Sequence, residues 1–184
     1  TGIHTVGEDQ YIFLDTPGIH KPRTKLGDFM VKTTAQTLSG VDSAILVTEA
    51  REEVGDIEAQ IISKFKSEGI RAILVINKID TVRKENIART IASYAGAYDF
   101  EAIIPVAAKS GKGVDTVLSE CEKLLRESEW FFPDDIITDQ PERAIMAEIV
   151  REKVLECTSD EIPHAVAVEM LEVKERLDGT VYAN

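Results

Sequence analysis

The sequence of 184 residues lacks the features that mark several classes of protein. It has only two cysteines, Cys121 and Cys157, so we expect free thiols in a reducing cytoplasm and no disulfide framework. Its apolar runs are short, 72–76 being typical, and none is long enough to span a bilayer. We find no charged and apolar leader, so nothing suggests secretion. A content of 43% hydrophobic and 29% charged residues excludes a disordered or collagen-like chain.

Positive charge is scarce, and its scarcity is uneven. The chain has 21 basic and 33 acidic side chains, for a net charge of −12. Residues 1–126 are nearly balanced at −2, whereas residues 127–184 carry −10. By electrostatics alone the second part should repel a phosphate backbone. The change in composition falls near Trp130-Phe131-Phe132-Pro133 and predicts a first domain over 1–127, a linker over 128–138 and a second unit over 139–184.

The first domain alternates short apolar runs with segments of helical composition. Apolar runs of this kind are typical of strands buried on both faces, and the intervening helices make crossover connections between parallel strands. The fold class is therefore α/β. The expected strands are 3–6, 11–14, 44–47, 72–76 and 103–106. The expected helices are 26–38, one from Ile57 to its end at Gly69, one from Ile87 to its end at Gly96, and 114–125.

The second unit has a different pattern. We expect a helix with Asp139 as its N-cap and Pro141 in its first turn, ending near Cys157. Near-alternation over 166–173 predicts a half-buried strand, and Asp178-Gly179 predicts a hairpin turn before a return strand.

Three loops of unusual composition follow three of the expected strands. In an open parallel sheet, ligands bind at the carboxyl ends of the strands. The first loop is Asp15-Thr16-Pro17-Gly18. Its carboxylate can hold Mg²⁺ through the water shell of the ion, and its glycine lets a backbone N–H approach a terminal phosphate. Asp, Pro and Gly also form ordinary turns, and that interpretation stays open for this loop alone.

The second loop, Asn77-Lys78-Ile79-Asp80, carries the most specific chemistry. The carboxylate of Asp80 can accept two hydrogen bonds from adjacent N–H groups of a guanine edge, a donor pair that adenine lacks. The stem of Lys78 can lie over the flat base, and Asn77 can anchor both the loop and the base. The structural alternative is a capped connection between a strand and a helix.

The third loop, Ala107-Ala108-Lys109-Ser110-Gly111, offers small residues where a backbone N–H would contact the carbonyl of guanine. By itself it is equally compatible with a plain connection between a strand and a helix. The three loops gain weight together, because we expect all of them on the same edge of one parallel sheet, in this order and 62 and then 30 residues apart.

These loops resemble the third, fourth and fifth sequence motifs of the translation-factor-related GTPases. The resemblance covers essentially the whole chain. Within that group, three further segments resemble a bacterial ribosome-assembly GTPase: Gly18-Ile19-His20-Lys21-Pro22, Leu26-Gly27-Asp28-Phe29-Met30 and Glu161-Ile162-Pro163-His164. It implies a P-loop-type GTPase domain over 1–127 and the start of an α+β RNA-binding domain of the KH type over 139–184.

The resemblance also implies roles for individual residues. Asp15 would hold Mg²⁺ through water, and Gly18 would donate its N–H to the γ-phosphate of GTP, with Thr16 and Pro17 in the same loop. Asn77, Lys78 and Asp80 would hold guanine, and Ala107, Ala108 and Lys109 would close its other side. Ile19 stands where Ras-like relatives have a water-orienting glutamine, which implies slow hydrolysis or a water held by other groups.

Two motifs of such proteins are absent from the 184 residues. There is no G-x-x-x-x-G-K-[ST] phosphate cradle, since Gly111-Lys112 lacks the glycine five residues earlier, and there is no G-x-x-G nucleic-acid clamp. We therefore expect a fragment of a longer protein. Without a central first strand, the strands at 11–14 and 44–47 would each have an unpaired edge, which predicts self-association or rearrangement.

The sequence is compatible with two functions. The first is a GTP-binding and GTP-hydrolysing switch that binds small-subunit ribosomal RNA and acts in assembly of the small ribosomal subunit, in the cytoplasm and with peripheral membrane association implied by resemblance. The alternative is a nucleotide-free scaffold without GTPase activity. We name no catalytic residue.

Overall fold

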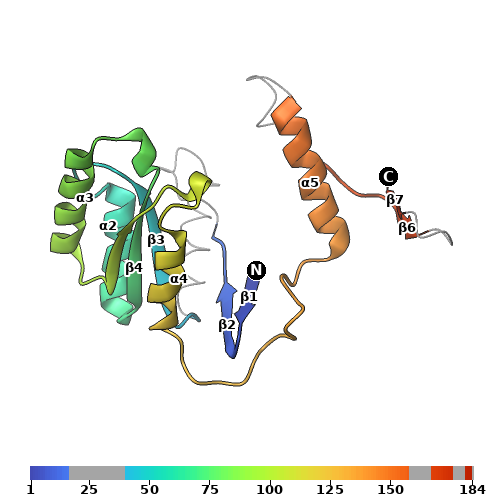
Figure 1. Cartoon of the computed structure of the whole chain (residues 1–184), viewed down its shortest axis with the longest axis horizontal. Helices are drawn as coiled ribbons and strands as arrows, with labels where there is room; N and C mark the ends of the chain where they lie inside the picture. Colours follow the sequence, from blue (N-terminus) through green and yellow to red (C-terminus); the bar gives the residue numbers. More distant parts are fainter. Residues whose placement is uncertain (17–39, 158–166, 176–180, 184) are drawn as a thin grey trace. The chain divides into compact units, whose positions relative to one another are not determined.

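The computed structural model describes residues 1–16, 40–157, 167–175 and 181–183 (Figure 1). Its chain divides into two compact units, one of which comprises His4–Pro133. The other comprises Thr1–Ile3 and Asp134–Asn184. The two units are described separately. The assignment of the second unit to a KH-type domain stays a prediction.

The larger unit is built on a three-stranded parallel sheet. Its strands are β3 (Ser43–Glu49), β4 (Arg71–Asn77) and β5 (Ala102–Pro105), in the order β3-β4-β5. The central strand β4 is buried from residue 72 to residue 76, as a continuous apolar run predicts. The α/β fold class is confirmed.

Helices cover both faces of this sheet (Figure 1). They are α2 (Asp56–Glu68), α3 (Lys84–Ala97) and α4 (Val114–Glu122), with short 3-10 helices η1 (Ile79–Thr81) and η2 (Ala108–Ser110). Phe65 of α2 and Tyr94 of α3 pack with Leu74 of β4. Cys121 of α4 packs with Ile73 on the opposite face. Because side chains alternate along a strand, consecutive residues of β4 supply two separate cores.

Two predicted helix ends have different outcomes. Gly69 caps α2 in the left-handed conformation, with φ of 63°, and its N–H donates to the carbonyl of Phe65. The prediction that Gly96 ends the next helix is wrong, because α3 continues to Ala97. Tyr98 ends it in an extended conformation, with its ring centroid 5.8 Å from that of Phe65. The helix therefore ends one residue after the predicted glycine.

Residues 1–16 contain a separate two-stranded sheet of β1 (Gly2–Val6) and β2 (Asp9–Phe13). Tyr11 of β2 packs against the core cluster that contains Cys121. In the described part of the chain β2 does not pair with β3, so the expectation that all three loops follow strands of one sheet holds for the second and third loops only. The reason is that no described strand lies between β2 and β3 to join the two sheets. The expected helix over 26–38 lies outside the described residues.

The segment after α4 is anchored to the β1–β2 turn. The indole N–H of Trp130 donates to the carbonyl of Glu8 at 2.8 Å. The Oε1 atom of Gln10 accepts the backbone N–H groups of Phe131 and Phe132, each at 3.0 Å. The first residues of the expected linker are therefore held by hydrogen bonds to the larger unit.

The smaller unit contains α5 (Glu142–Cys157) and a hairpin of β6 (Val173–Glu175) and β7 (Val181–Ala183). The two strands are antiparallel, with Val173 opposite Ala183, so the predicted hairpin is confirmed. Its turn residues, 176–180, lie outside the described residues. The strand expected over 166–173 begins only at Val173. No helix in the described ranges combines the length and the apolar character that a membrane span requires.

Asp139 is not the N-cap of α5, contrary to the prediction. The carbonyl of Pro141 accepts the N–H groups of Ala144 at 2.8 Å and Ile145 at 3.3 Å, so Pro141 occupies the cap position. The carboxylate of Asp139 instead accepts the hydroxyl of Thr1 at 2.8 Å. A partner distant in sequence thus draws this side chain away from the helix.

Candidate functional site

The second and third loops lie side by side at the carboxyl ends of β4 and β5. The ladder between these parallel strands continues into both loops: the N–H of Val106 donates to the carbonyl of Ile76 at 2.8 Å. The carbonyl of Val106 then accepts the N–H of Ile79 at 3.2 Å. The hydrogen bonds of the sheet therefore hold the backbones of the two loops next to each other.

Asn77 joins the loops through its side chain. Its Oδ1 atom accepts the backbone N–H of Lys78 at 2.8 Å and that of Ala108 at 3.1 Å. The two donors come from different loops, so a single half-buried amide holds them together. This contact is the anchoring role that the sequence predicts for Asn77, now with its partners identified.

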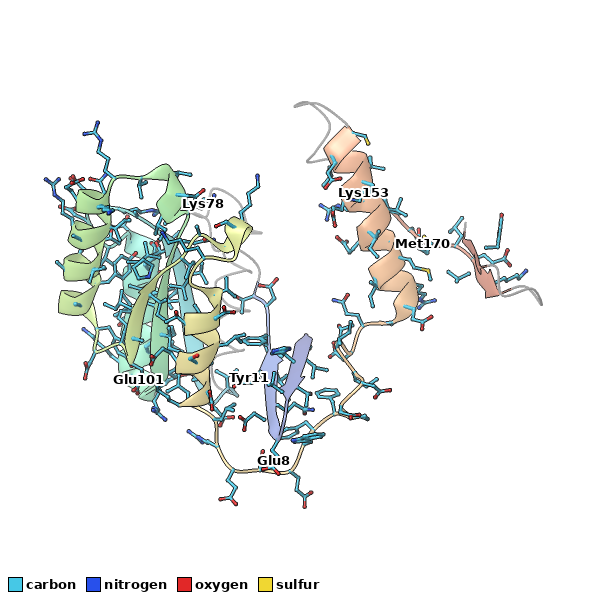
Figure 2. The ribbon with its side chains drawn as sticks, viewed as in Figure 1. Glu8, Tyr11, Lys78, Glu101, Lys153 and Met170 are labelled. Carbon is cyan, nitrogen blue, oxygen red and sulfur yellow. The ribbon has the colours of Figure 1, made fainter. Side chains whose placement is uncertain are left out.

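Lys78 has an unusual backbone. With φ of 58° and ψ of 35° it is the one non-glycine residue with positive φ among the described ranges. That conformation costs about 1–2 kcal/mol for a residue with a Cβ. Local bonds offset the cost, because the Lys78 carbonyl accepts both the N–H and the hydroxyl of Thr81, at 3.0 and 2.8 Å. Figure 2 shows the Lys78 side chain at the end of the sheet that carries both loops.

Asp80 presents an available carboxylate. It lies in η1, and its neighbour Ile79 packs against the core while Asp80 itself is exposed. Over the described residues, no ion pair or side-chain hydrogen bond occupies it. An exposed carboxylate on a rigid turn can accept two parallel N–H groups from a flat ligand.

The third loop is tightly closed. Ala107 is 2% exposed, its N–H donates to the carbonyl of Lys112 at 2.9 Å, and its carbonyl accepts the N–H and hydroxyl of Ser110. Both backbone groups of Ala107 therefore serve the loop. Ala108 and Lys109 are exposed. Within the described chain the N–H of Lys109 has no acceptor, which leaves one donor on the surface of this loop.

Gly113 accounts for the shape of this loop. Its φ is 84°, and a Cβ placed there would lie 2.9 Å from the carbonyl oxygen of Pro105 and 3.1 Å from a methyl carbon of Val106. The chain can return to the end of β5 only because this position has no side chain.

The first loop is described only in part. Asp15 is exposed and Thr16 half-buried, whereas Pro17 and Gly18 lie outside the described residues. In the described ranges no hydrogen bond or ion pair joins Asp15 to the second and third loops. Those ranges also contain no cluster of three or more groups that could hold a metal ion. One exposed carboxylate fits a Mg²⁺ that keeps most of its waters, and does not fit a metal held mainly by protein.

Glu49 is a site residue that the sequence analysis did not select. It ends β3 and stands opposite Asn77 in the β3–β4 register. Its Oε1 atom lies 2.6 Å from the Nζ atom of Lys78. The hydrogen bond and charge of Lys78 lower the pKa of this carboxyl from its ordinary value. The signal available in the sequence was an acidic residue at the end of a buried strand, which is too common to select.

The chain matches a model of the elongation factor Tu GTP-binding domain over residues 4–127. It belongs to this family of GTP-binding domains. The resemblance to one bacterial GTPase is also confirmed, because curated relatives that match nearly the whole chain are named GTPase Era. The chain is 42% identical to GTPase Era of Ruminiclostridium cellulolyticum over 98% of its own length and 60% of that protein. It is 44% identical to GTPase Era of Clostridium acetobutylicum over 94% of its length and 58% of that protein.

Solved Era structures share the fold. A single-residue variant of Aquifex aeolicus Era bound to GDP and AlF4⁻ aligns with a TM-score of 0.82 and 35% identity, over 97% of this chain and 61% of that one. Era in complex with MgGDPNP and nucleotides 1506–1542 of 16S ribosomal RNA aligns with a TM-score of 0.82 and 34% identity, over the same shares. The chain therefore spans about 60% of the length of the relatives that it matches.

Proposed function

We propose that the protein carrying this sequence binds guanine nucleotides at the ends of β4 and β5 and hydrolyses GTP. The observation that carries the proposal is the contact of Asn77 with Lys78 and Ala108. It brings the two loops together beside Asp80, whose carboxylate has no ion pair or side-chain hydrogen bond with the described residues. Membership of a GTP-binding domain family supports the same conclusion.

The base is recognised by complementary groups. Asp80 accepts the two adjacent N–H groups of guanine, and the stem of Lys78 covers a face of the ring. The exposed turn at Ala108 and Lys109, shaped by Ala107, supplies a backbone N–H for the base carbonyl. Adenine would leave the Asp80 carboxylate facing an acceptor, which is the basis of strong discrimination.

The phosphate end of the ligand is assigned to the first loop. Asp15 holds Mg²⁺ through bound water, and Gly18, which follows Thr16 and Pro17, approaches the terminal phosphate. When bound, Mg²⁺ supplies neutralisation of the negative charge on the phosphates. Ile19 has no hydrogen-bonding group to orient an attacking water, so we expect slow turnover. The relatives solved with GDP and AlF4⁻ and with MgGDPNP support binding of a guanine nucleotide and Mg²⁺.

We extend the proposal to ribosomal RNA. The Era structure that contains nucleotides of 16S ribosomal RNA supports binding to small-subunit RNA by the whole protein. A role in small-subunit assembly, in the cytoplasm or peripherally at the membrane, is the corresponding cellular prediction. The excess of acidic residues in 127–184 supports RNA contacts in other parts of the whole protein, because these charges repel a phosphate backbone.

The alternative, a scaffold without nucleotide, applies to the 184 residues by themselves. These residues contain no phosphate cradle, which supplies most of the affinity for a nucleotide. In the described part of the chain β3 pairs with β4 on one side only, and Val47 of β3 is 59% exposed. An open edge beside an apolar side chain supports self-association of this piece.

The test uses the full-length protein that carries this sequence, with the 184-residue chain measured beside it. Fluorescent GDP, ADP and XDP are titrated into the wild type and into Asp80→Asn. Xanthine has a carbonyl where guanine has an amino group, so an amide at position 80 can donate where the carboxylate could only accept. We expect the wild type to bind GDP and not ADP, and Asp80→Asn to lose GDP and gain XDP.

Two results would contradict the proposal. Equal binding of GDP and ADP by the wild type would show that the site does not read the base. Unchanged GDP binding by Asp80→Asn would show that the base lies elsewhere. Hydrolysis is measured as phosphate release at saturating GTP, and its absence would limit the function to binding. If only the 184-residue chain fails to bind, the scaffold alternative describes that piece.

A further inference from the structure

We infer that Glu49 is a positioning residue for the base site, holding the Lys78 side chain where it covers the guanine ring. The inference rests on the proposed function and adds to it a residue outside the recognised loops. Glu49 acts through Lys78, and so it requires no contact with the nucleotide.

The geometry follows from the sheet. Glu49 and Asn77 are the last residues of neighbouring parallel strands and are paired in the register. Lys78 is the next residue after Asn77, and its Nζ atom lies 2.6 Å from Oε1 of Glu49. The left-handed backbone of Lys78 determines where its side chain leaves the loop. The ion pair therefore determines where the far end of that side chain lies.

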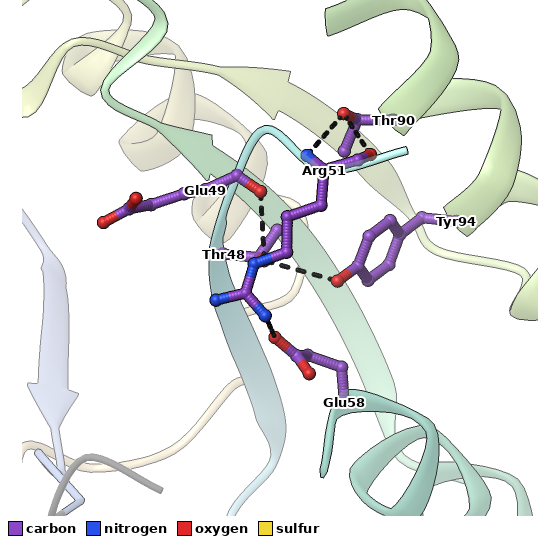
Figure 3. Close-up of polar contacts among 6 residues, drawn as sticks. All are labelled: Thr48, Glu49, Arg51, Glu58, Thr90 and Tyr94. Atoms are coloured by element: carbon purple, nitrogen blue, oxygen red, sulfur yellow. Dashed lines mark hydrogen bonds and ion pairs between the residues drawn. The ribbon is translucent and has the colours of Figure 1, made fainter. Parts of the chain in front are cut away.

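The backbone around Glu49 is held by buried contacts (Figure 3). The hydroxyl of Thr48 lies 3.3 Å from that of Tyr94, whose ring is fully buried. The backbone N–H of Arg51 donates to the hydroxyl of Thr90 at 3.0 Å, and Thr90 is also fully buried. Residues on both sides of Glu49 are thus tied to α3, so the carboxylate starts from a rigid position.

The consequence is a lysine side chain that is ordered before the ligand arrives. A lysine has four flexible carbons and loses rotamer freedom when it packs against a ring. A partner that already restricts those rotamers removes part of this cost from the binding step. Both groups are more than half exposed, at 60% for Lys78 and 55% for Glu49. The gain is therefore that of a surface ion pair, about two- to five-fold in affinity.

The experiment is a double-mutant cycle on GDP binding by the full-length protein. Glu49→Gln keeps the size of the side chain and removes its charge, and Lys78→Met keeps the stem and removes the ammonium. We expect Glu49→Gln to weaken GDP binding about two- to five-fold in the wild-type background. In the Lys78→Met background the same substitution should change the affinity by less than about 1.5-fold, because no ammonium remains to hold.

Glu52→Gln is the matched control. Glu52 also forms an exposed ion pair, with Arg89 at 2.7 Å, and is three residues away in the sequence. We expect its GDP affinity to equal that of the wild type. A structural role of Glu49 alone would weaken binding equally in both Lys78 backgrounds, and that result would overturn the inference. Equal affinity of Glu49→Gln and the wild type would also overturn it.

The failures of the two proposals are distinguishable. The wild type could bind GDP and Asp80→Asn fail to bind it, while Glu49→Gln has the affinity of the wild type. That result would support the base site and contradict the positioning role of Glu49. If the wild type does not discriminate GDP from ADP, the base site itself is wrong and the inference falls with it.

Discussion

The side-chain oxygen of Asn77 accepts the backbone N–H of Ala108 at 3.1 Å, which joins the loop after β4 to the loop after β5. The same oxygen accepts the N–H of Lys78 at 2.8 Å. A single amide therefore organises two loops that are 30 residues apart in the sequence.

Asn77 allows this joining role to be separated from any contact with a ligand. Asn77→Ala removes the acceptor and should lower the free energy of unfolding by about 1 kcal/mol, since water can replace a bond near the surface. Asn77→Asp keeps an oxygen that accepts both N–H groups, so it should stay within about 0.5 kcal/mol of the wild type. Urea unfolding measures both. An Asn77→Ala variant as stable as the wild type would show that the bonds contribute nothing.

Thr90 ties the end of β3 to α3 and is fully buried. Its hydroxyl accepts the N–H of Arg51 at 3.0 Å and lies 2.7 Å from the carbonyl of Arg51. Thr90→Val keeps the shape of the side chain but leaves these groups unpaired, at a cost of about 1–3 kcal/mol.

Thr90→Ser is the control, since it keeps the hydroxyl and loses one buried methyl, at about 1 kcal/mol. Hydrogen exchange at the Arg51 amide separates the two effects. It should speed up in Thr90→Val and change little in Thr90→Ser. The same exchange rate in both variants would argue against the bond.

Gly113 is predicted to tolerate no side chain. An alanine there has a positive φ, costing about 1–2 kcal/mol, and its Cβ would meet the backbone oxygen of Pro105 at 2.9 Å. Gly69 has φ of 63° with nothing within 4 Å of a Cβ, so Gly69→Ala isolates the cost of the backbone. Thermal unfolding should show Gly113→Ala to be less stable than Gly69→Ala by at least about 1 kcal/mol. Equal losses would mean that the loop moves freely away from β5.

Glu101 gives a prediction for pH. Its carboxylate accepts the Nε–H of Arg71 at 2.8 Å, and this bond lowers the pKa of Glu101 from its ordinary value of 4.5. The ionised form is thus favoured in the folded state, so the stabilisation is present above the unfolded pKa. It is lost as the pH falls through the lower, folded pKa.

The comparison is between the wild type and Glu101→Gln in urea at several pH values. The wild type should have the higher midpoint at pH 7, and the difference should vanish as the pH falls below 4.5 through the pKa of the folded protein. Glu129→Gln is the control, since it removes an exposed carboxylate that forms no ion pair in the described part of the chain, and its urea midpoint at pH 7 should equal that of the wild type. A gap that persists in acid would trace the effect to something other than ionisation.

Local sequence was sufficient for the sheet and for most of the site. The run 72–76 had to be a buried strand, because every residue in it is apolar and both faces of the sheet are covered. Asn77 and Ala108 could be brought together from the sequence, since loops that follow parallel strands lie at the same edge. The exact ends of two helices could not be predicted from the local sequence. Gly96 and Asp139 carry the local signals of a helix end and a helix cap, yet α3 continues to Ala97 and the Asp139 carboxylate accepts the hydroxyl of Thr1.

The residue types and spacing of the two loops therefore identified which side chains could recognise a base, because that chemistry resides in a few consecutive residues. Only the folded chain placed Glu49 beside Lys78. The two are 29 residues apart, and nothing near either one in the sequence indicates the contact. Their contact arises from the pairing of β3 with β4, and the central strand β4 is buried between helices on both faces of the sheet.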